Sequence, residues 1–339
     1  MSMSSPRGVR QRPAAASALG ALVLACALVA SAVVGTDALG TGDALGALLR
    51  PDVASRVAVT IVWQLRLPRA LGGVVCGAAL AVSGLLLQAV LDNRLAAPSV
   101  MGINAGAGLA VLVCGLALPF VPLARQLSAL AGALVATLAV MLVARRAGVS
   151  RTTLVLAGVA VASLFSAGSD ALVTARPDLV ADRVAFQLGG LAGVSWQQLQ
   201  VAAAITLVGI VAAYALGPGV DLLALGDQTA FGLGLDARLH RACAVVIAAA
   251  LASAAVSVAG LVGFVGLIVP NLVRMVARGG FREEAVACAI WGACLLVGCD
   301  LVGRLVLYPY ELPVGLVLSL LGAPFFLAML MRGRGGMRR

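Results

Sequence analysis

The sequence has very few charged residues, and none of them is lysine. Only 11% of its 339 residues are charged, 62% are hydrophobic and the mean hydropathy is +1.07, whereas a soluble domain carries about 25% charged residues. This composition excludes an ordinary soluble enzyme and a disordered chain. All 24 basic residues are arginine, so the chain has no P-loop lysine for nucleotide hydrolysis and no lysine for a Schiff base.

Histidine and paired cysteines are also scarce. His240 is the only histidine, which excludes His-based zinc motifs and most His–carboxylate relays. The seven cysteines lie in apolar runs without a Cys-x-x-Cys pair, so we expect them to pack as small hydrophobic side chains. The sequence therefore predicts no catalytic residues, no metal site and no resident cofactor.

Long charge-free windows are what the sequence has instead. A helix that crosses a bilayer needs about 20 apolar residues, and such windows are the main sign of membrane spans. They predict an all-α polytopic membrane protein with one transmembrane domain over residues 1–339. Its ten helices are expected at 14–35, 69–91, 99–119, 126–146, 152–173, 199–217, 241–262, 265–278, 284–303 and 313–331. The first window is expected to stay as a helix rather than be removed as a signal peptide.

The arginines predict the orientation. With the N-terminus inside, sixteen of them lie at inner helix ends and eight at outer ends, so the positive-inside rule places both termini in the cytoplasm. The cytoplasmic parts are then the N-terminus 1–13, the longest connection 217–241 and the tail 332–339. The net charge of +10 reflects this topology, and we expect bilayer lipid but no nucleic acid as a partner.

Three polar features stand out from the apolar background. Arg66-Leu-Pro-Arg69 is expected at the outer mouth of the second span, either as an interfacial anchor or as a docking surface for an acidic partner, since guanidinium groups bind carboxylates bidentately. Asp300 and Arg304 are spaced i, i+4, as in a structural salt bridge. Asp170 is a lone intramembrane acid, which indicates either a functional site or hydration near the outer interface.

The connection 217–241 is amphipathic and interrupted by glycines. It is long enough for two short helices. A membrane protein without a nucleotide site of its own could use it to bind a cytosolic partner. Two glycine pairs, Gly73-x-x-x-Gly77 and Gly102-x-x-x-Gly106, predict close helix packing.

Five motifs in order resemble those of the FecCD-type permeases, the membrane subunits of type II ABC importers for iron–siderophore complexes, haem and cobalamin. They are Trp63-Gln-Leu-Arg-Leu-Pro-Arg69, Gly77-Ala-Ala-Leu-Ala-Val-Ser-Gly84 with Gln88, Asn93-x-Leu-Ala-x-Pro98 with Gly102, Gly263-Phe-Val-Gly-Leu-Ile-Val-Pro270, and Asp300-x-x-x-Arg304 with Glu311-Leu-Pro-x-Gly315 and Gly322-Ala-Pro324. The resemblance extends from Trp63 to Arg332. It implies ten helices, as the charge-free windows do.

The resemblance also implies partners and roles. Two permease subunits, expected to be a homodimer, would form the pathway in the bacterial inner membrane, with two ATP-binding subunits inside and a substrate-binding protein outside. Arg66, Arg69 and Arg304 would accept acidic residues of that binding protein. The ATPase coupling loop would contain Gly226, Asp227, Ala230, Leu233 and Gly234. The cytoplasmic gate would contain Asn93, Arg94 and Leu95, and the fifth and tenth helices would line the pathway.

Two residues depart from the family pattern. Arg94 stands where a proline is usual and adds charge at the gate position. Asn271 stands where a histidine is usual, so it keeps hydrogen-bonding capacity but cannot act as a pH switch.

The function expected from these features is ATP-driven import of an iron–siderophore complex, with hydrolysis on a partner chain. Haem or cobalamin is the alternative cargo. An ion-coupled secondary transporter would need intramembrane acids around a midplane site, for which Asp170 is the only mid-chain candidate. An intramembrane enzyme would need a nucleophile–base or metal constellation, and none is visible in the sequence.

Overall fold

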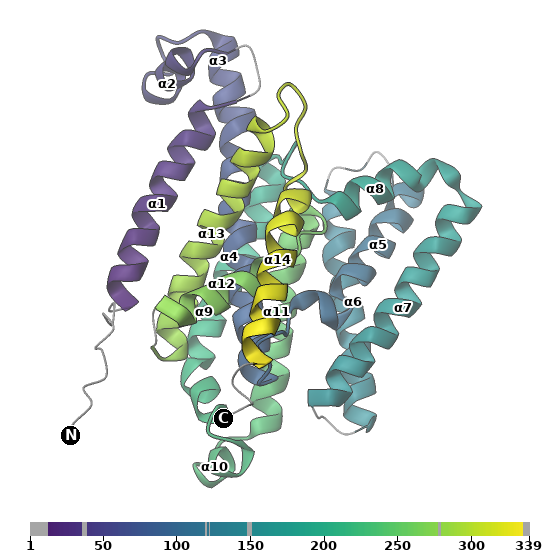
Figure 1. The fold of residues 1–339 in the computed structure, drawn as a ribbon. Helices are drawn as coiled ribbons and strands as arrows, with labels where there is room; N and C mark the ends of the chain where they lie inside the picture. The colour runs from purple at the N-terminus through teal and green to yellow at the C-terminus, as the bar shows by residue number, and fades with distance from the viewer. Residues whose placement is uncertain are drawn as a thin grey trace, which may run out of the picture.

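The computed structural model describes residues 13–35, 39–118, 121, 123–147, 151–276 and 279–334, which are mostly helical (Figure 1). The predicted N-terminal residues 1–12 and residues 335–339 of the predicted tail lie outside this part. The α-helices are α1 (Pro13–Val33), α2 (Thr41–Leu49), α3 (Arg56–Thr60), α4 (Leu67–Val90), α5 (Ile103–Ala117), α6 (Ala124–Ala147), α7 (Arg151–Ala175), α8 (Val180–Leu188), α9 (Trp196–Leu223), α10 (Asp227–Gly232), α11 (Ala237–Ala259), α12 (Val265–Val276), α13 (Phe281–Leu305) and α14 (Val314–Arg334). A π-helical segment, Ile61–Arg66, joins α3 to α4, and short 3-10 turns cover Pro98–Met101 and Pro177–Leu179.

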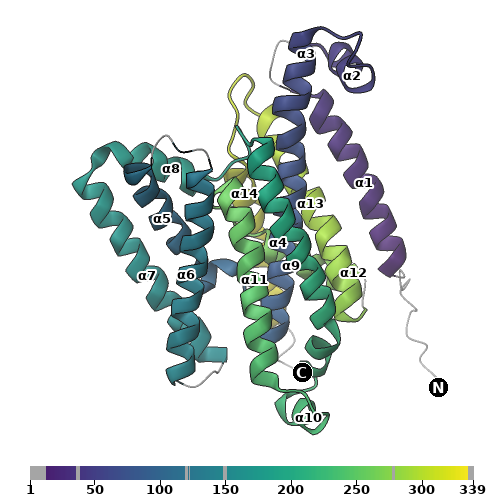
Figure 2. The ribbon, with the colours of Figure 1, turned by 180° about the vertical axis from the view of Figure 1, so that it is seen from behind.

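Helix α4 lies at the centre of the bundle, packed against α9, α11, α12 and α13 (Figures 1 and 2). Helices α5, α6 and α7 form a group on one side, and α1 packs on α13 on the other. Helices α2 and α3 lie at one end of the bundle and α10 at the opposite end, here named the α2 end and the α10 end. Helix α1 begins and helix α14 ends towards the α10 end, so the first and last described residues lie on the same side of the bundle.

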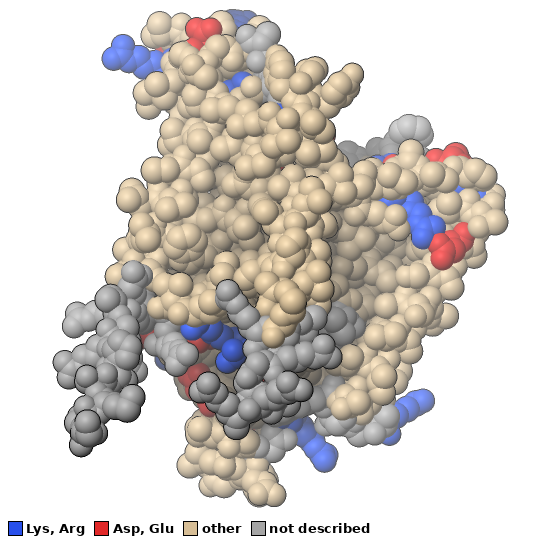
Figure 3. Space-filling view, viewed as in Figure 1, with Lys and Arg blue, Asp and Glu red and all other residues tan. Residues whose placement is uncertain are grey.

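The prediction of an all-helical, multi-span protein is confirmed. Within the described residues, seven helices are long and apolar enough to cross a membrane, and the three shorter apolar helices are Ile103–Ala117, Val265–Val276 and Val314–Met329. Each of these ten overlaps one predicted window. On the face shown in Figure 3, charged side chains gather towards the two ends and leave an uncharged band between them.

Glycines allow the backbones of the central helices to touch. A Cβ on Gly77 of α4 would collide with the carbonyl of Gly292 in α13, and a Cβ on Gly84 would collide with that of Gly266. Gly106 of α5 faces a residue of α6 in the same way. Close helix packing was predicted for Gly77 and Gly106, and the structure confirms it for both.

Two alanine substitutions in α13 are expected to differ sharply. Gly292→Ala forces a methyl group into the α4 backbone and should destabilise the protein by about 1–3 kcal/mol, the usual cost of overpacking. Gly298→Ala has open space around its Cβ and should be neutral or slightly stabilising because alanine favours a helix. Thermal unfolding of both variants in the same detergent tests the difference. Equal melting temperatures would contradict this description of the α4–α13 contact.

The second span begins earlier than predicted. The sequence was divided at Arg69, but one apolar helical stretch runs from Arg56 to Val90. Arg66 and Arg69 therefore lie inside a helix rather than at its boundary. Charge marks a helix end only where the charged group reaches water, and both side chains have partners within the protein.

The predicted connection 217–241 is shorter in the structure. Helix α9 continues through Pro218 to Leu223, and α11 already begins at Ala237. The connection is therefore shorter than expected and holds one short helix, α10, where its predicted length would have allowed two. Asp236 caps α11 by accepting hydrogen bonds from the backbone N–H groups of Arg238 and Leu239, which is why the chain turns there.

Candidate functional site

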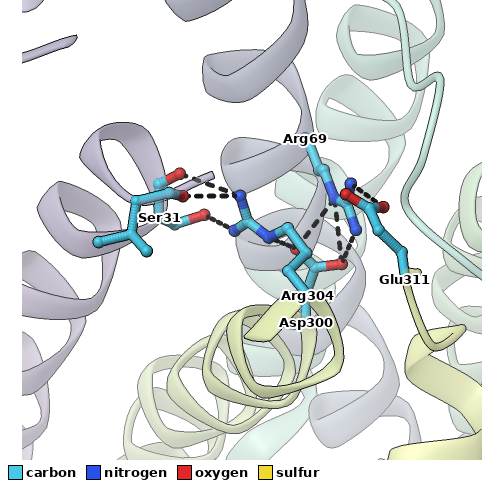
Figure 4. A network of polar contacts seen from close by, with 6 residues as sticks. Ser31, Arg69, Asp300, Arg304 and Glu311 are labelled. Atoms are coloured by element: carbon cyan, nitrogen blue, oxygen red, sulfur yellow. Dashed lines mark hydrogen bonds and ion pairs between the residues drawn. The ribbon is translucent and has the colours of Figure 1, made fainter. Parts of the chain in front are cut away.

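Four charged residues, Arg69, Asp300, Arg304 and Glu311, form a network at the α2 end (Figure 4). Arg69 of α4 donates to Asp300 of α13 through Nε, at 3.1 Å from Oδ1 and 3.0 Å from Oδ2, and through Nη2, at 2.9 Å from Oδ1. Arg304 Nε lies 3.2 Å from Asp300 Oδ2, so the predicted Asp300–Arg304 salt bridge is confirmed. Arg69 Nη1 also donates to Glu311 Oε2 at 2.7 Å. Arg66 lines the same pocket as Arg69, Arg304 and Glu311.

Arg66 and Arg304 hold the C-terminal end of α1. Arg66 Nη1 donates to the carbonyl oxygens of Ala32 at 3.1 Å and Val33 at 2.6 Å. Arg304 donates to the Ser31 carbonyl at 3.2 Å and to the Ser31 hydroxyl. The last carbonyls of a helix have no partner within it, and cations there are stabilised by the helix dipole. The two arginines therefore fix α1 to α4 and α13.

The structure thus brings the three predicted docking arginines together. Arg66, Arg69 and Arg304 line one pocket of about 370 Å³, with Glu311 on its rim. Arg66 is only 4% exposed and Arg304 only 2%, so neither is an exposed interfacial anchor. Their partners at the end of α1 lie far away in the sequence, which is why the sequence alone did not reveal these contacts. Docking of an acidic partner at this pocket stays a prediction.

Of the predicted coupling residues, Asp227 and Ala230 lie within α10 and the other three flank it; the side chain of Asp227 lies outside the part of the chain that the structure describes. Gly226 and Gly234 flank the helix with φ of +97° and +83°, a region that favours glycine. Ala230 is fully buried and ties α10 to the bundle, while Leu233 is 61% exposed. The sequence analysis missed Phe231, which is 78% exposed. The sequence feature that could have identified Phe231 is its aromatic side chain, which lies outside the predicted membrane spans in a connection with glycines on both sides.

The predicted gate residues form a tight turn at the α10 end, after α4. Asn93 Oδ1 accepts a hydrogen bond from the Leu95 N–H at 2.9 Å. Asn271 of α12 donates through Nδ2 to the Arg94 carbonyl at 3.1 Å and to the Leu267 carbonyl at 2.8 Å. The two departures from the family pattern, Arg94 and Asn271, are therefore in direct contact.

A polar chain supports this turn from the side. Arg274 of α12 donates to Gln88 Oε1 at 2.9 Å and to Glu284 Oε2 at 3.1 Å. Gln88 in turn donates to the Gly266 carbonyl at 3.0 Å. With Asn93 and Arg94, these side chains border a pocket of about 250 Å³. The turn is thus attached to α12 through Asn271, and Arg274 links α12 to the end of α4 and to α13.

Asp170 is not the isolated acid that its sequence context indicated. Its carboxylate lies 2.5 Å from Arg183 Nη2 of α8, and its side chain is 61% exposed. This environment is typical of a surface ion pair.

Comparisons with known proteins agree with the fold. The model of the FecCD transport family matches residues 22–332. A Fe(3+)-citrate import system permease protein of Bacillus subtilis is 38% identical, over 81% of this chain and 82% of the relative. A vitamin B12 import system permease protein of Serratia proteamaculans is 37% identical, over 82% of this chain and 84% of the relative.

A solved structure has the same arrangement of helices. It is that of a metal-chelate type ABC transporter in an inward-facing conformation, with a TM-score of 0.81 over 93% of this chain and 98% of that chain, at 24% identity. At this identity the likeness bears on the fold alone. The match of the family model over most of the chain decides membership. The chain belongs to the FecCD transport family and is a multi-pass membrane permease.

Proposed function

We propose that this chain is the transmembrane subunit of an ATP-driven importer and that two copies of it enclose the translocation pathway. The observation that carries the proposal is the chemical difference between the two ends of the bundle. The α10 end presents apolar Phe231 and Leu233 to water, and the α2 end presents a pocket of arginines. Since the chain has no lysine, a Walker site must come from separate ATPase subunits.

The orientation follows from the arginine distribution. The α10 end carries the excess of arginines and would face the cytoplasm of the bacterial inner membrane. Both termini would then be cytoplasmic. ATPase subunits would bind α10, and a substrate-binding protein would dock at the α2 end.

Coupling requires two states that each partner distinguishes. ATP binding would close the ATPase pair and move α10, whose Ala230 is packed into the bundle. The turn of Asn93, Arg94 and Leu95 would close the cytoplasmic end of the pathway. Because this turn is bound to α12 through Asn271, it would move together with that helix. Helices α7 and α14 would line that pathway.

The substrate we favour is an iron–siderophore complex, supported by the relative named for Fe(3+)-citrate import. The relative named for vitamin B12 is about equally similar, which keeps cobalamin as the second candidate, with haem a further alternative. Mass spectrometry of the ligand carried by the co-purified binding protein tests this assignment. Recovery of a ferric chelate supports it, and recovery of a corrinoid or haem overturns it.

Arg69→Gln is expected to weaken docking of the binding protein at least about tenfold, because truncating a partly buried charge at an interface mainly speeds dissociation. The side chain of Arg69 is 14% exposed at the pocket. The binding protein would first be identified as the one that the permease–ATPase complex retains in a pull-down. Its affinity for the purified complex would then be measured.

Arg125→Gln is the matched control for this variant. Arg125 lies at the start of α6, pairs with Asp182 of α8 and is largely exposed, so its loss removes the same charge outside the pocket. Affinity for this variant should stay close to that of the wild type. If Arg69→Gln and Arg125→Gln bound the binding protein equally well, docking at the arginine pocket would be rejected.

A further inference from the structure

Glu311 is the outward partner of Arg69 (Figure 4). The guanidinium of Arg69 has two occupied edges. Its Nε and Nη2 atoms face Asp300, whose side chain is 4% exposed, and its Nη1 faces Glu311, whose side chain is 31% exposed. Asp300 is therefore almost completely buried, whereas Glu311 is the more exposed of the two carboxylates on Arg69.

The position of Glu311 controls access to Arg69. Both residues line the arginine pocket of about 370 Å³ and also a neighbouring hollow of about 370 Å³ beside α8 and α14. A carboxylate that enters from outside can reach Arg69 only from its exposed edge, because the other edge is closed by Asp300. Glu311 already occupies Nη1 on that side.

We propose that Glu311 is a built-in competitor for the docking partner: an acidic side chain of the binding protein replaces it on Arg69. The inference rests on the proposed docking at the arginine pocket and adds a residue that sets its affinity. The exchange removes one carboxylate from Arg69 and supplies another, so the number of ion pairs on Arg69 is unchanged. The net gain in docking affinity from Arg69 is then smaller than it would be if Glu311 were absent.

The backbone around Glu311 is held in place without its side chain. The N–H of Leu312 donates to the Gly303 carbonyl at 2.9 Å, and the N–H of Gly315 donates to the Gly189 carbonyl at 3.4 Å. Release of the carboxylate therefore leaves the start of α14 attached to α13 and to the end of α8. We therefore expect a neutral side chain at position 311 to leave the surrounding backbone unchanged.

Glu311→Gln is expected to raise the affinity of the full complex for the binding protein about two- to fivefold, the range typical of a partly exposed ion pair. Glu311→Asp keeps the charge and should bind close to wild type. Asp178→Asn is the matched control, because Asp178 is an exposed carboxylate paired with Arg176 beside α8 and its loss changes the net charge equally. Its affinity should not rise to the same extent.

The Arg69→Gln background separates this inference from the docking proposal. Loss of binding in Arg69→Gln, together with no further gain from Glu311→Gln in that background, supports both. Loss of binding in Arg69→Gln with an unchanged or lower affinity in Glu311→Gln keeps docking but rejects competition by Glu311. An unchanged affinity in Arg69→Gln rejects docking at this pocket. If the affinity rose equally in Asp178→Asn and in Glu311→Gln, the effect would come from net charge alone, and competition by Glu311 would be rejected.

Discussion

Asp300→Asn is expected to destabilise the protein by about 3–5 kcal/mol, the cost of breaking a buried ion pair by removing one partner. Asp300 is the carboxylate between Arg69 and Arg304. Arg69 would keep Glu311, but Arg304, at 2% exposure, would lose its only charged partner among the described residues. Thermal unfolding and the yield of monodisperse protein in detergent measure the effect.

Two further variants define the cause. Asp178→Asn breaks an exposed ion pair and should unfold like the wild type. Asp300→Asn combined with Arg304→Gln should recover part of the lost stability, because the stranded cation is removed. The recovery is expected to be incomplete, since Arg304 also holds the end of α1. A single Asp300→Asn variant as stable as the wild type would contradict the network.

Phe231→Asp combined with Leu233→Asp is expected to abolish ATPase binding and to reduce ATP-driven uptake more than tenfold. Both side chains are largely exposed, so the permease itself should fold normally. Apolar anchors at an interface each contribute roughly 2 kcal/mol or more when they are hot spots, and a buried aspartate would add a desolvation cost. Co-purification of the ATPase subunits and uptake into vesicles are the measurements.

Val53→Asp is the matched control for the α10 variant. Val53 is another exposed apolar residue, but it lies between α2 and α3 at the opposite end. This variant should retain the ATPase subunits fully. Normal ATPase retention in the α10 double variant would show that α10 is not the coupling helix.

Hydropathy predicted the ten spans because an apolar window is a local property of the chain. The Asp300–Arg304 pair could also be predicted, since both residues lie on one turn of one helix. The contacts of Arg69 and Arg66 could not. Arg69 pairs with a residue 231 positions away, and Arg66 reaches the end of α1. Such pairings depend on how helices pack and cannot be read from neighbouring residues. Because these partners were unknown, the two arginines were taken to mark a helix boundary, and the start of the second span was misplaced.

The gate turn illustrates the same limit. The sequence marked Arg94 and Asn271 as two separate departures from the family pattern. In the structure, Asn271 donates a hydrogen bond to the backbone carbonyl of Arg94. An asparagine amide serves this purpose without a titratable group, and the interaction uses only the backbone of Arg94. The side chain of Arg94 takes no part in this hydrogen bond.

The connection before α11 shows where local signals mislead. The span was predicted to end at residue 217, yet α9 continues through Pro218 to Leu223. Packing stabilises this last part, because Gly217, Val220 and Leu223 are buried. Phe231 of α10 was missed for a different reason, since an apolar side chain in a membrane protein is expected to face lipid or core.

Uptake into proteoliposomes tests the central claim most directly. The complex of permease, ATPase subunits and substrate-loaded binding protein would be reconstituted, with nucleotide supplied on the ATPase side and substrate on the other. We expect uptake that requires ATP and the binding protein and that is unaffected when ion gradients are collapsed. Uptake by the permease alone, driven by an ion gradient without ATP, would contradict the account.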